Sequence, residues 1–516
     1  MKRLLILIAC AAAPVSLSAE QWQVLGTRPM GMGGAFVAVA QGPIAQYWNP
    51  AGLVKSSANV SGMDIPVGVT AEFTGDIIKN ASQIGDMADS FSATQADQRG
   101  GGAMDATQVA AFAKTVSLMS DMNEPGKGAL FQVAGGANFK FSKVALSVNN
   151  FTSVGLNPFI DTTNIGLSAN AGAGITGVDM SAANAAAPGD TATRDTIAGA
   201  ITTINYVNLE TLMCGGAGCL ATQTGNAVTN ATTLANALYN QASASGQTAA
   251  QITEAANQLA QYAPTVAPLI ASASSGASYT NNTSNLGVTG ASFIEVAAGY
   301  AWNKDKWLPG LSVGGNIKAV NGKTARTSFR FMSESDTGDA FKLEDMKSSW
   351  QPAMDIGFLW DVNKRYPKFP LRPRMGLVIR NINSPSFKVN GGGDYDLDRQ
   401  ARLGFALNPA KFWTLAMDLD LTKNKTPVRG FDSRQLCLGT EINIINRKAF
   451  NIPLRAGIMS NLAEKDSKMA YTAGTGINLL FMHFDVSAVV SSEKTELDGE
   501  DIPTKVGLAA SFGLLF

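Results

Sequence analysis

Histidine is almost absent from this chain, with His483 as the single example among 516 residues. A histidine-based catalytic triad or a multi-histidine metal site therefore has little to be built from. Charged residues are also scarce, at 16% of the chain, and 40 basic side chains balance 40 acidic ones. A neutral chain lacks the basic face that nucleic acid requires. These absences predict a protein that is not an enzyme, binds no nucleic acid and needs no cofactor or metal.

The mature chain also lacks a long apolar run, so no transmembrane helix is expected. The N-terminus nevertheless has the features of a secretory signal peptide. Two basic residues open it, residues 4–17 are apolar, and small residues follow at 18–19. We expect residues 1–19 to be removed and the mature chain to begin at Glu20. A second interpretation is a lipoprotein box at Leu7 to Cys10, with Cys10 as the lipidated residue, but the apolar run before Cys10 is short for that processing.

Cysteine is scarce as well, at four residues. Cys10 leaves with the signal peptide, and Cys437 lies on the polar face of a predicted strand without an obvious partner. Cys214 and Cys219 have a spacing that suits half of a zinc site, but no further Cys or His cluster would complete one. In an oxidising compartment we therefore predict a disulfide between Cys214 and Cys219.

What the chain does contain is strict alternation of apolar residues with polar or small ones. In residues 411–423 one face carries Trp and large aliphatic side chains, and the other carries Thr, Ala and Asp. About ten such residues cross a bilayer when the strand is tilted. The alternation recurs at 350–361, 432–445 and 503–516. A soluble β-sandwich also alternates, but small or acidic polar faces, an aromatic C-terminal residue and alternately short and long connections favour a membrane barrel.

Counting these segments gives about fourteen strands, an even number, as a bacterial single-chain barrel requires. One further strand-like run, Arg326 to Met332, would make the count odd and is interpreted as part of a projecting hairpin arm. Both chain ends then lie in the periplasm, with short turns on that side and long loops outside. The predicted strands are 57–75, 128–139, 142–151, 288–302, 310–320, 350–361, 373–382, 398–407, 411–422, 432–445, 449–460, 468–479, 482–491 and 503–516.

The long outer loops contain helical patterns. Residues 104–122 and 248–270 place apolar side chains at helical spacing, the second until Pro264 interrupts it. The Ala-rich, polar composition around the second stretch is also compatible with partial disorder. We favour surface helices that cap the barrel mouth.

A glycine-rich motif, RPMGMGGAFVAVAQGPIAQYWNPAGL, runs from Arg28 to Leu53. A dinucleotide-binding loop would follow a strand and open a βαβ helix, whereas this motif follows a signal peptide and leads into barrel strands. The motif resembles the N-terminal segment of FadL-like outer-membrane proteins. That superfamily includes fatty-acid and aromatic-hydrocarbon channels, PorV-type secretion proteins and TraF-type conjugal-transfer proteins. With the later stretches GDIIKN, GKGALFQVAGGANFKFSKVALSVNNFT and VIRNINSPSF, the chain is most similar to the TraF-type branch.

In the channel members, the matching segment folds inside the barrel as a plug, so the resemblance implies a plug inside the lumen here. Its glycines would allow close packing against the wall, Pro50 would fix a bend, and Asn49 would stabilise the turn. Arg28 would pair with a lumen acid such as Asp418 or Asp420. The alternative is that these residues only fold the plug and touch no ligand. The plug residues carried over are Arg28, Gly31, Gly33, Gly34, Asn49, Pro50, Ala51 and Gly52.

The sequence thus predicts an all-β fold, an antiparallel transmembrane β-barrel of about 14 strands with an N-terminal plug inside the lumen and helical extracellular insertions. The terminal strand carries an assembly signal, Phe512, Leu514 and Phe516, of the kind read by the barrel assembly machinery. The expected boundaries are a signal peptide at 1–19, a plug segment at 20–56, and a barrel at 57–516 with helical insertions at 76–127 and 152–287.

The function implied by the resemblance is passive transport of hydrophobic or amphipathic small molecules across the bacterial outer membrane. The alternative is a TraF-like conjugal-transfer or PorV-like secretion component that acts through protein–protein contacts. The expected partners are therefore outer-membrane lipid and the assembly machinery, together with either hydrophobic small molecules or conjugation and secretion proteins. A channel predicts a path through the lumen, whereas an interaction protein predicts a sealed lumen and a large exposed apolar patch on the loops.

Overall fold

The computed structural model describes most of the chain. The described residues are 18–54, 61–80, 106–161, 190–214, 216–273, 283–330, 348–389, 393–447, 449–465, 467–497 and 499–515. Residues 1–17 of the predicted signal peptide (1–19) and Phe516 of the predicted assembly signal lie outside these residues.

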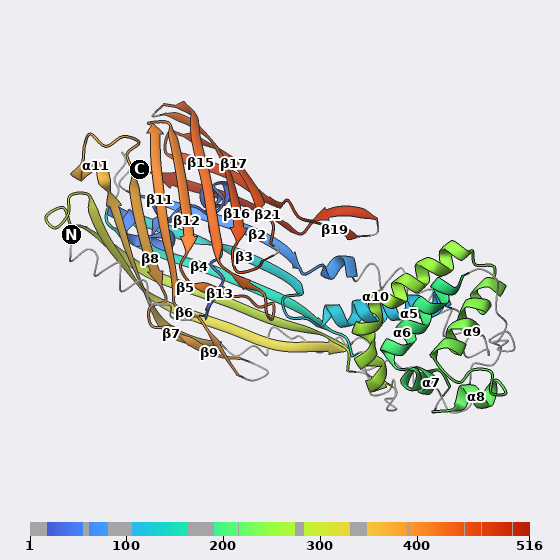
Figure 1. The fold of residues 1–516 in the computed structure, drawn as a ribbon. Helices are drawn as coiled ribbons and strands as arrows, with labels where there is room; N and C mark the ends of the chain where they lie inside the picture. Colours follow the sequence, from blue (N-terminus) through green and yellow to red (C-terminus); the bar gives the residue numbers. More distant parts are fainter. Residues whose placement is uncertain are drawn as a thin grey trace.

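Fourteen antiparallel strands form a closed barrel, which confirms the fold class predicted from the sequence (Figure 1). Closure is made by the first and last barrel strands, where Ile65 pairs with Phe512 and Met63 with Leu514. In chain order the barrel strands are β2 (Ser61–Thr74), β3 (Gly128–Phe141), β4 (Val144–Phe159), β5 (Asn285–Asn303), β6 (Leu311–Arg330), β7 (Ser348–Asp361), β8 (Arg374–Arg380), β11 (Gln400–Ala410), β12 (Trp413–Asp420), β15 (Gln435–Asn446), β16 (Phe450–Asn461), β17 (Ala470–Leu479), β18 (Met482–Ser491) and β21 (Lys505–Leu515).

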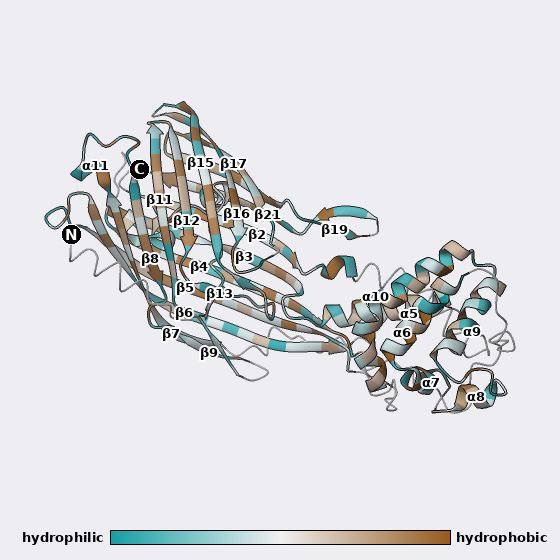
Figure 2. Ribbon diagram, viewed as in Figure 1, coloured by the Kyte–Doolittle hydropathy of each residue, from teal (hydrophilic) through white to brown (hydrophobic). Residues whose placement is uncertain are grey.

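The alternation in the sequence becomes an outer and an inner surface. On β2, Ile65, Val67 and Val69 point outward and are 43–51% exposed, whereas the intervening residues are buried. Figure 2 shows the same change of hydropathy from residue to residue along the strands. A closed ladder leaves no unpaired edge, and its outward apolar side chains suit a hydrocarbon environment. Among the described residues, no helix is long and apolar enough to span a membrane.

The run from Arg326 to Met332 is not a separate strand. Up to Arg330 it continues β6 and pairs with the first residues of β5, for example Arg326 with Thr289. Strand β7 pairs with β6 only as far as Lys323. The ends of β4, β5 and β6 on this side of the barrel therefore extend beyond β7. The even strand count is kept because the projecting part prolongs existing strands.

A helical lobe lies beyond the end of the barrel at which these extended strands finish (Figure 1). Its helices are α5 (Ala106–Met122), α6 (Thr191–Ile204), α7 (Tyr206–Cys214), α8 (Cys219–Gln223), α9 (Ala231–Ala244) and α10 (Ala249–Ala273). The lobe has a hydrophobic core of its own, which includes Ile197, Ile201, Leu234, Leu238, Ile252, Leu259, Val266 and Ile270.

The predicted interruption at Pro264 was wrong. Helix α10 continues to Ala273 with Pro264 and Pro268 inside it. Val266 and Ile270 extend its buried face past the first proline into the lobe core, so tertiary packing outweighs the lost backbone hydrogen bond.

The N-terminal segment runs through the barrel interior. It contains β1 (Ser18–Glu20), α2 (Thr27–Gly31), α3 (Ala45–Trp48) and the 3-10 helix η1 (Pro50–Val54), and nearly all of its residues are buried. We call residues 20–54 the plug segment. Short elements complete the fold: β9 (Ser386–Lys388) pairs with β10 (Asp394–Asp396), β13 (Lys423–Lys425) with β1 and β14 (Asp432–Ser433), and β19 (Lys494–Leu497) with β20 (Glu500–Pro503), while α11 (Val362–Arg365) lies in a short turn.

Candidate functional site

The barrel wall carries glycine where the plug segment passes. A Cβ atom added to Gly357 would lie 2.2 Å from Oδ1 of Asn49, and one added to Gly439 would lie 2.3 Å from the carbonyl oxygen of Met32. Both distances are far inside van der Waals contact, so no larger residue fits. The inward glycines face one another across neighbouring strands: Gly314 with Gly357, Gly376 with Gly404, and Gly439 with Gly457. We call these six residues the glycine belt.

The predicted plug glycines meet this wall from the other side. Gly33 has a φ of +66°, and a Cβ atom there would lie 2.7–2.8 Å from backbone atoms of Ile458 and Leu438. Its amide donates a hydrogen bond to Oγ1 of Thr472 at 2.9 Å. A Cβ atom on Gly31 would lie 3.2 Å from Cα of Gly474, and one on Gly34 would lie 3.0 Å from Sγ of Cys437. Backbone therefore packs directly on backbone along this side of the lumen.

The Asn49-Pro50-Ala51-Gly52 turn is bonded to both plug and wall. Nδ2 of Asn49 donates to the carbonyl oxygen of Val37 at 3.1 Å and to that of Phe358 on β7 at 3.0 Å. Oδ1 of Asn49 accepts the amide of Ala51 at 3.1 Å, which closes the turn. A Cβ atom on Gly52 would lie 2.4 Å from the carbonyl oxygen of Ala40. These residues fold and seat the plug segment.

Arg28 does not pair with the predicted acids. Its Nε and Nη2 donate to the two carboxylate oxygens of Glu441 on β15, each at 2.8 Å. Asp418 instead accepts the amides of Phe36 and Val37 at 2.8 and 2.9 Å. The plug segment turns after Gly31. This turn brings the backbone amides of Phe36 and Val37, and not the Arg28 side chain, next to Asp418.

Arg402 on β11 forms an ion pair with Asp420 and neutralises its charge. Its Nε donates to Asp420 at 2.5 Å, and both side chains are 1% exposed. The guanidinium carbon lies 4.5 Å from the Trp22 ring centroid and 5.7 Å from that of Trp48, so two plug indoles enclose this cation. Trp48 also donates through Nε1 to the carbonyl oxygen of Leu25 at 2.9 Å.

A second cation, Arg380, contacts the other aromatic side of the plug segment. Its guanidinium carbon lies 4.1 Å from the Tyr47 ring, which stacks on Phe151 of β4 at 5.0 Å. Burial raises the pKa of Tyr47 to about 12. Arg380 is neutralised by Glu295 at 3.1 Å. Tyr47 and Trp48 therefore shield two buried lumen cations, Arg380 and Arg402.

A loop from the outer side reaches the start of the plug segment. Phe387 and Tyr395, on β9 and β10, pack against lumen-facing residues of β5, β6 and β7. The hydroxyl of Tyr395 donates to Glu20, and that of Ser153 donates to it at 3.1 Å. Burial raises the pKa of Glu20 to about 7, although both hydroxyl groups oppose this shift.

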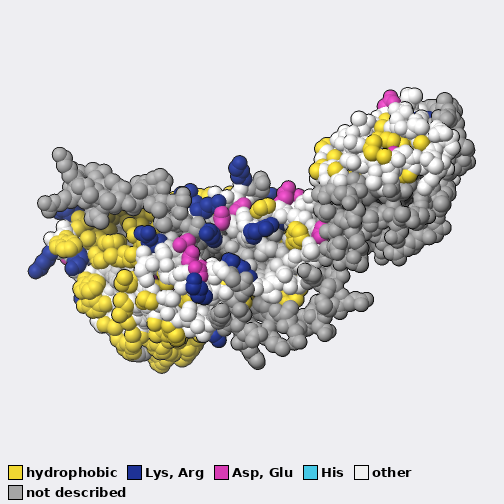
Figure 3. Space-filling model, turned by 90° about the horizontal axis from the view of Figure 1, so that it is seen from below, with side chains coloured by type: hydrophobic (Ala, Val, Ile, Leu, Met, Phe, Trp, Pro, Cys, Tyr) yellow, Lys and Arg dark blue, Asp and Glu magenta, His cyan; other side chains and the backbone are white. Residues whose placement is uncertain are grey.

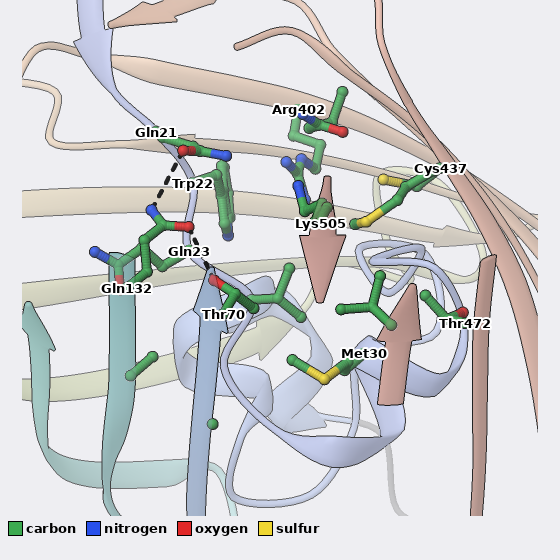
Figure 4. A pocket seen from close by; sticks show the side chains of 16 residues that line it. Gln21, Trp22, Gln23, Met30, Thr70, Gln132, Arg402, Cys437, Thr472 and Lys505 are labelled. Carbon is green, nitrogen blue, oxygen red and sulfur yellow. Dashed lines mark hydrogen bonds between the residues drawn. The ribbon is translucent and has the colours of Figure 1, made fainter. Parts of the chain in front are cut away.

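A small cavity separates the plug segment from one side of the wall (Figure 4). We call this space, of about 40 Å³, the plug cavity. Trp22 and Met30 line it from the plug, and Cys437, Met459 and Lys505 line it from the wall. Figure 4 shows Trp22, Met30, Cys437 and Lys505 around one space between the plug and strands of the wall. The lining is amphipathic, since it also includes Gln21, Gln23, Thr70, Gln132, Arg402, Gln435 and Thr472.

Larger spaces lie on both sides of the plug cavity. The outer vestibule, of about 380 Å³, opens toward the long loops and shares Gln435, Met459 and Lys505 with the plug cavity. The inner vestibule, of about 280 Å³, lies toward the short turns and is lined by Arg28, Glu441, Arg455, Asp485 and His483 among others. The three spaces follow one another along the β15–β21 and β2 side of the lumen.

Buried donors without partners point to what the plug cavity holds. Among the described residues, Nε1 of Trp22 and Nη1 of Arg402 have no hydrogen-bond acceptor, and both side chains are at most 3% exposed. Lys505, also at the cavity, is neutralised by Glu72 at 2.8 Å. The two donors at this lining are therefore available to an oxygen acceptor of a solute.

The described residues contain no group of three Cys, His, Asp or Glu side chains that could hold a metal ion. Residues 310–314 spell G-x-S-x-G, but Ser312 lies at the start of β6, not in the strand-to-helix turn that exposes a nucleophile. Cys219 is disulfide-bonded, while the side chain of its predicted partner Cys214 lies outside the described residues, so that pairing stays a prediction.

The comparisons with known proteins place part of the chain in a family context. Residues 171–420, just under half of the chain, match the family model described as "F plasmid transfer operon, TraF, protein". The predicted resemblance to TraF-type proteins is thereby confirmed over a span that excludes the N-terminal motif. No curated protein sequence matches the chain.

Several solved barrel structures are similar over nearly the whole chain. The toluene transporter TbuX of Ralstonia pickettii is 11% identical with a TM-score of 0.41, covering 95% of this chain and 98% of its own. The toluene transporter TodX of P. putida is 10% identical with a TM-score of 0.40 and the same coverage. A FadL homologue of Pseudomonas aeruginosa is 8% identical with a TM-score of 0.38, covering 97% and 99%.

Proposed function

We propose that this protein is an exported outer-membrane β-barrel that lets small amphipathic molecules pass passively along its lumen. The supporting observation is the succession of outer vestibule, plug cavity and inner vestibule on one side of the plug segment. Apolar and hydrogen-bonding side chains alternate around the plug cavity, which suits a solute with both kinds of surface. The lumen as a whole is too polar for a purely hydrocarbon solute.

Passage requires side chains of the plug cavity to move. A volume of about 40 Å³ holds only a few water molecules. Met30, Met459 and Lys505 border it, and all three have long unbranched side chains that change rotamer readily. Met459 and Lys505 line both the outer vestibule and the plug cavity, so their side chains control passage between these two spaces.

Cys437 allows a direct test of this path, because it is the free cysteine among the described residues and lines the plug cavity. A small methanethiosulfonate reagent added to the folded barrel at about pH 9 should modify Cys437, as measured by mass spectrometry. Met459→Ala should raise the modification rate by roughly tenfold, since it removes a side chain shared by the outer vestibule and the plug cavity. The matched control is Met417→Ala, which changes a methionine on the outward face and should leave the rate unchanged.

The corresponding transport measurement is uptake of a fluorescent fatty acid into liposomes that contain the protein. Met459→Ala should increase uptake together with the labelling rate. If denatured protein is modified fully while the folded barrel and Met459→Ala both resist the reagent, and Met459→Ala also leaves uptake unchanged, the transport proposal fails.

The alternative function, a conjugal-transfer or secretion component, is favoured by one observation. The helical lobe folds around its own core outside the barrel, and the TraF family match covers most of it. Helices α6 to α10 of the lobe leave the barrel between two adjacent points, because Asp161 and Thr283 are joined by a hydrogen bond of 3.0 Å.

This closeness allows α6 to α10 to be deleted, while α5, from the loop between β2 and β3, stays in place. Replacing residues 163–281 with a short Gly-Ser linker should leave uptake into liposomes within about twofold of the full chain if the barrel lumen carries the function. Retained uptake with lost conjugation or secretion in cells would assign the lobe a partner-binding role. The migration of unheated protein on a gel reports whether the shortened barrel has folded.

A further inference from the structure

The end of the barrel with the short turns is strongly basic, although the chain as a whole is neutral. Its described turns are residues 142–143, 304–310, 362–373, 411–412, 447, 449 and 480–481. Together they contain nine Lys or Arg and a single acid, Asp305: one basic residue in the first turn, two in the second, four in the third, and one each at 411 and 447. The charge is thus concentrated at one rim and is not compensated there.

Two of these turns form one surface. Strands β6 and β7 are paired, so the turns 304–310 and 362–373 lie side by side. Trp360 donates through Nε1 to the carbonyl oxygen of Pro309 at 3.2 Å, and Nζ of Lys364 lies 4.0 Å from Asp305. We call the surface of these two turns the basic rim; its cations are Lys304, Lys306, Lys364, Arg365, Lys368 and Arg372.

Large apolar side chains stand between these cations. Trp307 is 76% exposed, and Tyr366, Phe369 and Leu371 are 47–53% exposed. Lys304 lies 4.8 Å from the Trp307 ring, and Arg365 lies 5.6 Å from the Tyr366 ring. Aromatic side chains flanked by cations are typical of the interface between hydrocarbon and head groups.

The basic rim continues into the outward face of the barrel. Tyr300 and Trp302 on β5 point outward next to the turn 304–310, with their ring centroids 4.7 Å apart. Figure 3 shows dark blue Lys and Arg side chains at the barrel end opposite the lobe, bordering a broad hydrophobic surface. A phospholipid seated here would place its acyl chains on that surface and its phosphate among the cations.

We propose that the basic rim is a binding site for phospholipids with an anionic head group of the phosphatidylglycerol class. The positive charge of the rim and its continuity with the lipid-facing surface favour such a lipid over an acidic protein. Turns this short keep the cations at the depth of the head groups, where Lys and Arg attract anionic lipid. Arg also binds phosphate through two parallel hydrogen bonds. In a zwitterionic lipid, the ammonium of the head group offsets the phosphate charge and weakens this attraction.

Native mass spectrometry of the purified full chain in detergent tests the proposal, with palmitoyl-oleoyl phosphatidylglycerol or the matching phosphatidylcholine added. The unmodified chain should bind the anionic lipid at least about tenfold more tightly. The variant K364Q/R365Q/K368Q/R372Q should bring the two affinities within about twofold of each other. All four side chains are exposed, so folding should be unaffected, and gel migration of the unheated protein checks this.

The matched control removes the same number of charges from the outer end, in K423Q/K465Q/K468Q/K494Q, and should keep the preference. If the control loses the preference as fully as the rim variant, the effect is one of net charge and the proposed site is wrong. Equal binding of the two lipids by the unmodified chain overturns the proposal as well, and leaves an acidic protein as the occupant to be sought. Neither outcome bears on passage through the lumen.

Discussion

Gly33→Ala should unseat the plug segment while the barrel still assembles. The new Cβ would lie 2.7–2.8 Å from backbone atoms of Ile458 and Leu438, which belong to paired wall strands and have no rotamer to change. The left-handed φ of +66° adds strain of its own. Together we expect a loss of about 2–5 kcal/mol in docking of the plug segment. The barrel ladder itself is closed without the plug.

The measurement is the rate at which a methanethiosulfonate reagent modifies Cys437, with gel migration of the unheated protein as the check on the barrel. The rate should rise by at least roughly tenfold, because the cavity wall formed by the plug moves away. Gly42→Ala is the matched control. Gly42 has a similar φ of +73° in the same segment but nothing within 4 Å of an added Cβ, so it carries the strain without the clash. Equal rates for the two variants would mean that close packing at Gly33 does not hold the plug.

The barrel could be predicted from the sequence because its signal is local. The alternation on β12, between Trp413 and Asp420, predicts which side chains face outward before any partner strand is known. The position at which a strand ends depends on distant residues. Strand β6 continues to Arg330 because β5 supplies a pairing partner up to that residue. Helix α10 passes Pro264 for a similar reason, since the lobe core lies around it.

The plug site was predictable in its residues but not in its partners. The motif singled out Asn49 and the glycines, which in the structure lie against the wall, and small inward residues such as Gly357 were visible in the alternation. The pairing of Arg28 with Glu441 spans 413 residues and depends on how the plug turns inside the lumen. The plug cavity likewise combines residues from the plug and from strands β2, β3, β11, β15, β16, β17, β18 and β21, which no spacing in the sequence brings together.

Loss of the buried cation Arg402 should destabilise the protein more than loss of any exposed one. Arg402→Met keeps the side-chain length but leaves Asp420 without its charge partner, in contact with Gln435 and Asn424 alone. It also removes the cation enclosed by Trp22 and Trp48. Breaking a buried ion pair from one side costs about 3–5 kcal/mol, to be measured by urea unfolding in lipid vesicles.

A cation–carboxylate pair at the surface shows how much of the destabilisation depends on burial of the ion pair. Lys423 pairs with Asp432 at 2.7 Å, but the two side chains are 59% and 27% exposed, so Lys423→Gln should cost less than about 1 kcal/mol. The double variant Arg402→Met, Asp420→Asn should recover more than half of the loss, since it removes the stranded charge. A double variant no more stable than Arg402→Met would assign the loss to packing of the guanidinium against the indoles. In that case the plug aromatics, rather than the charge of Asp420, would be what requires arginine at this position.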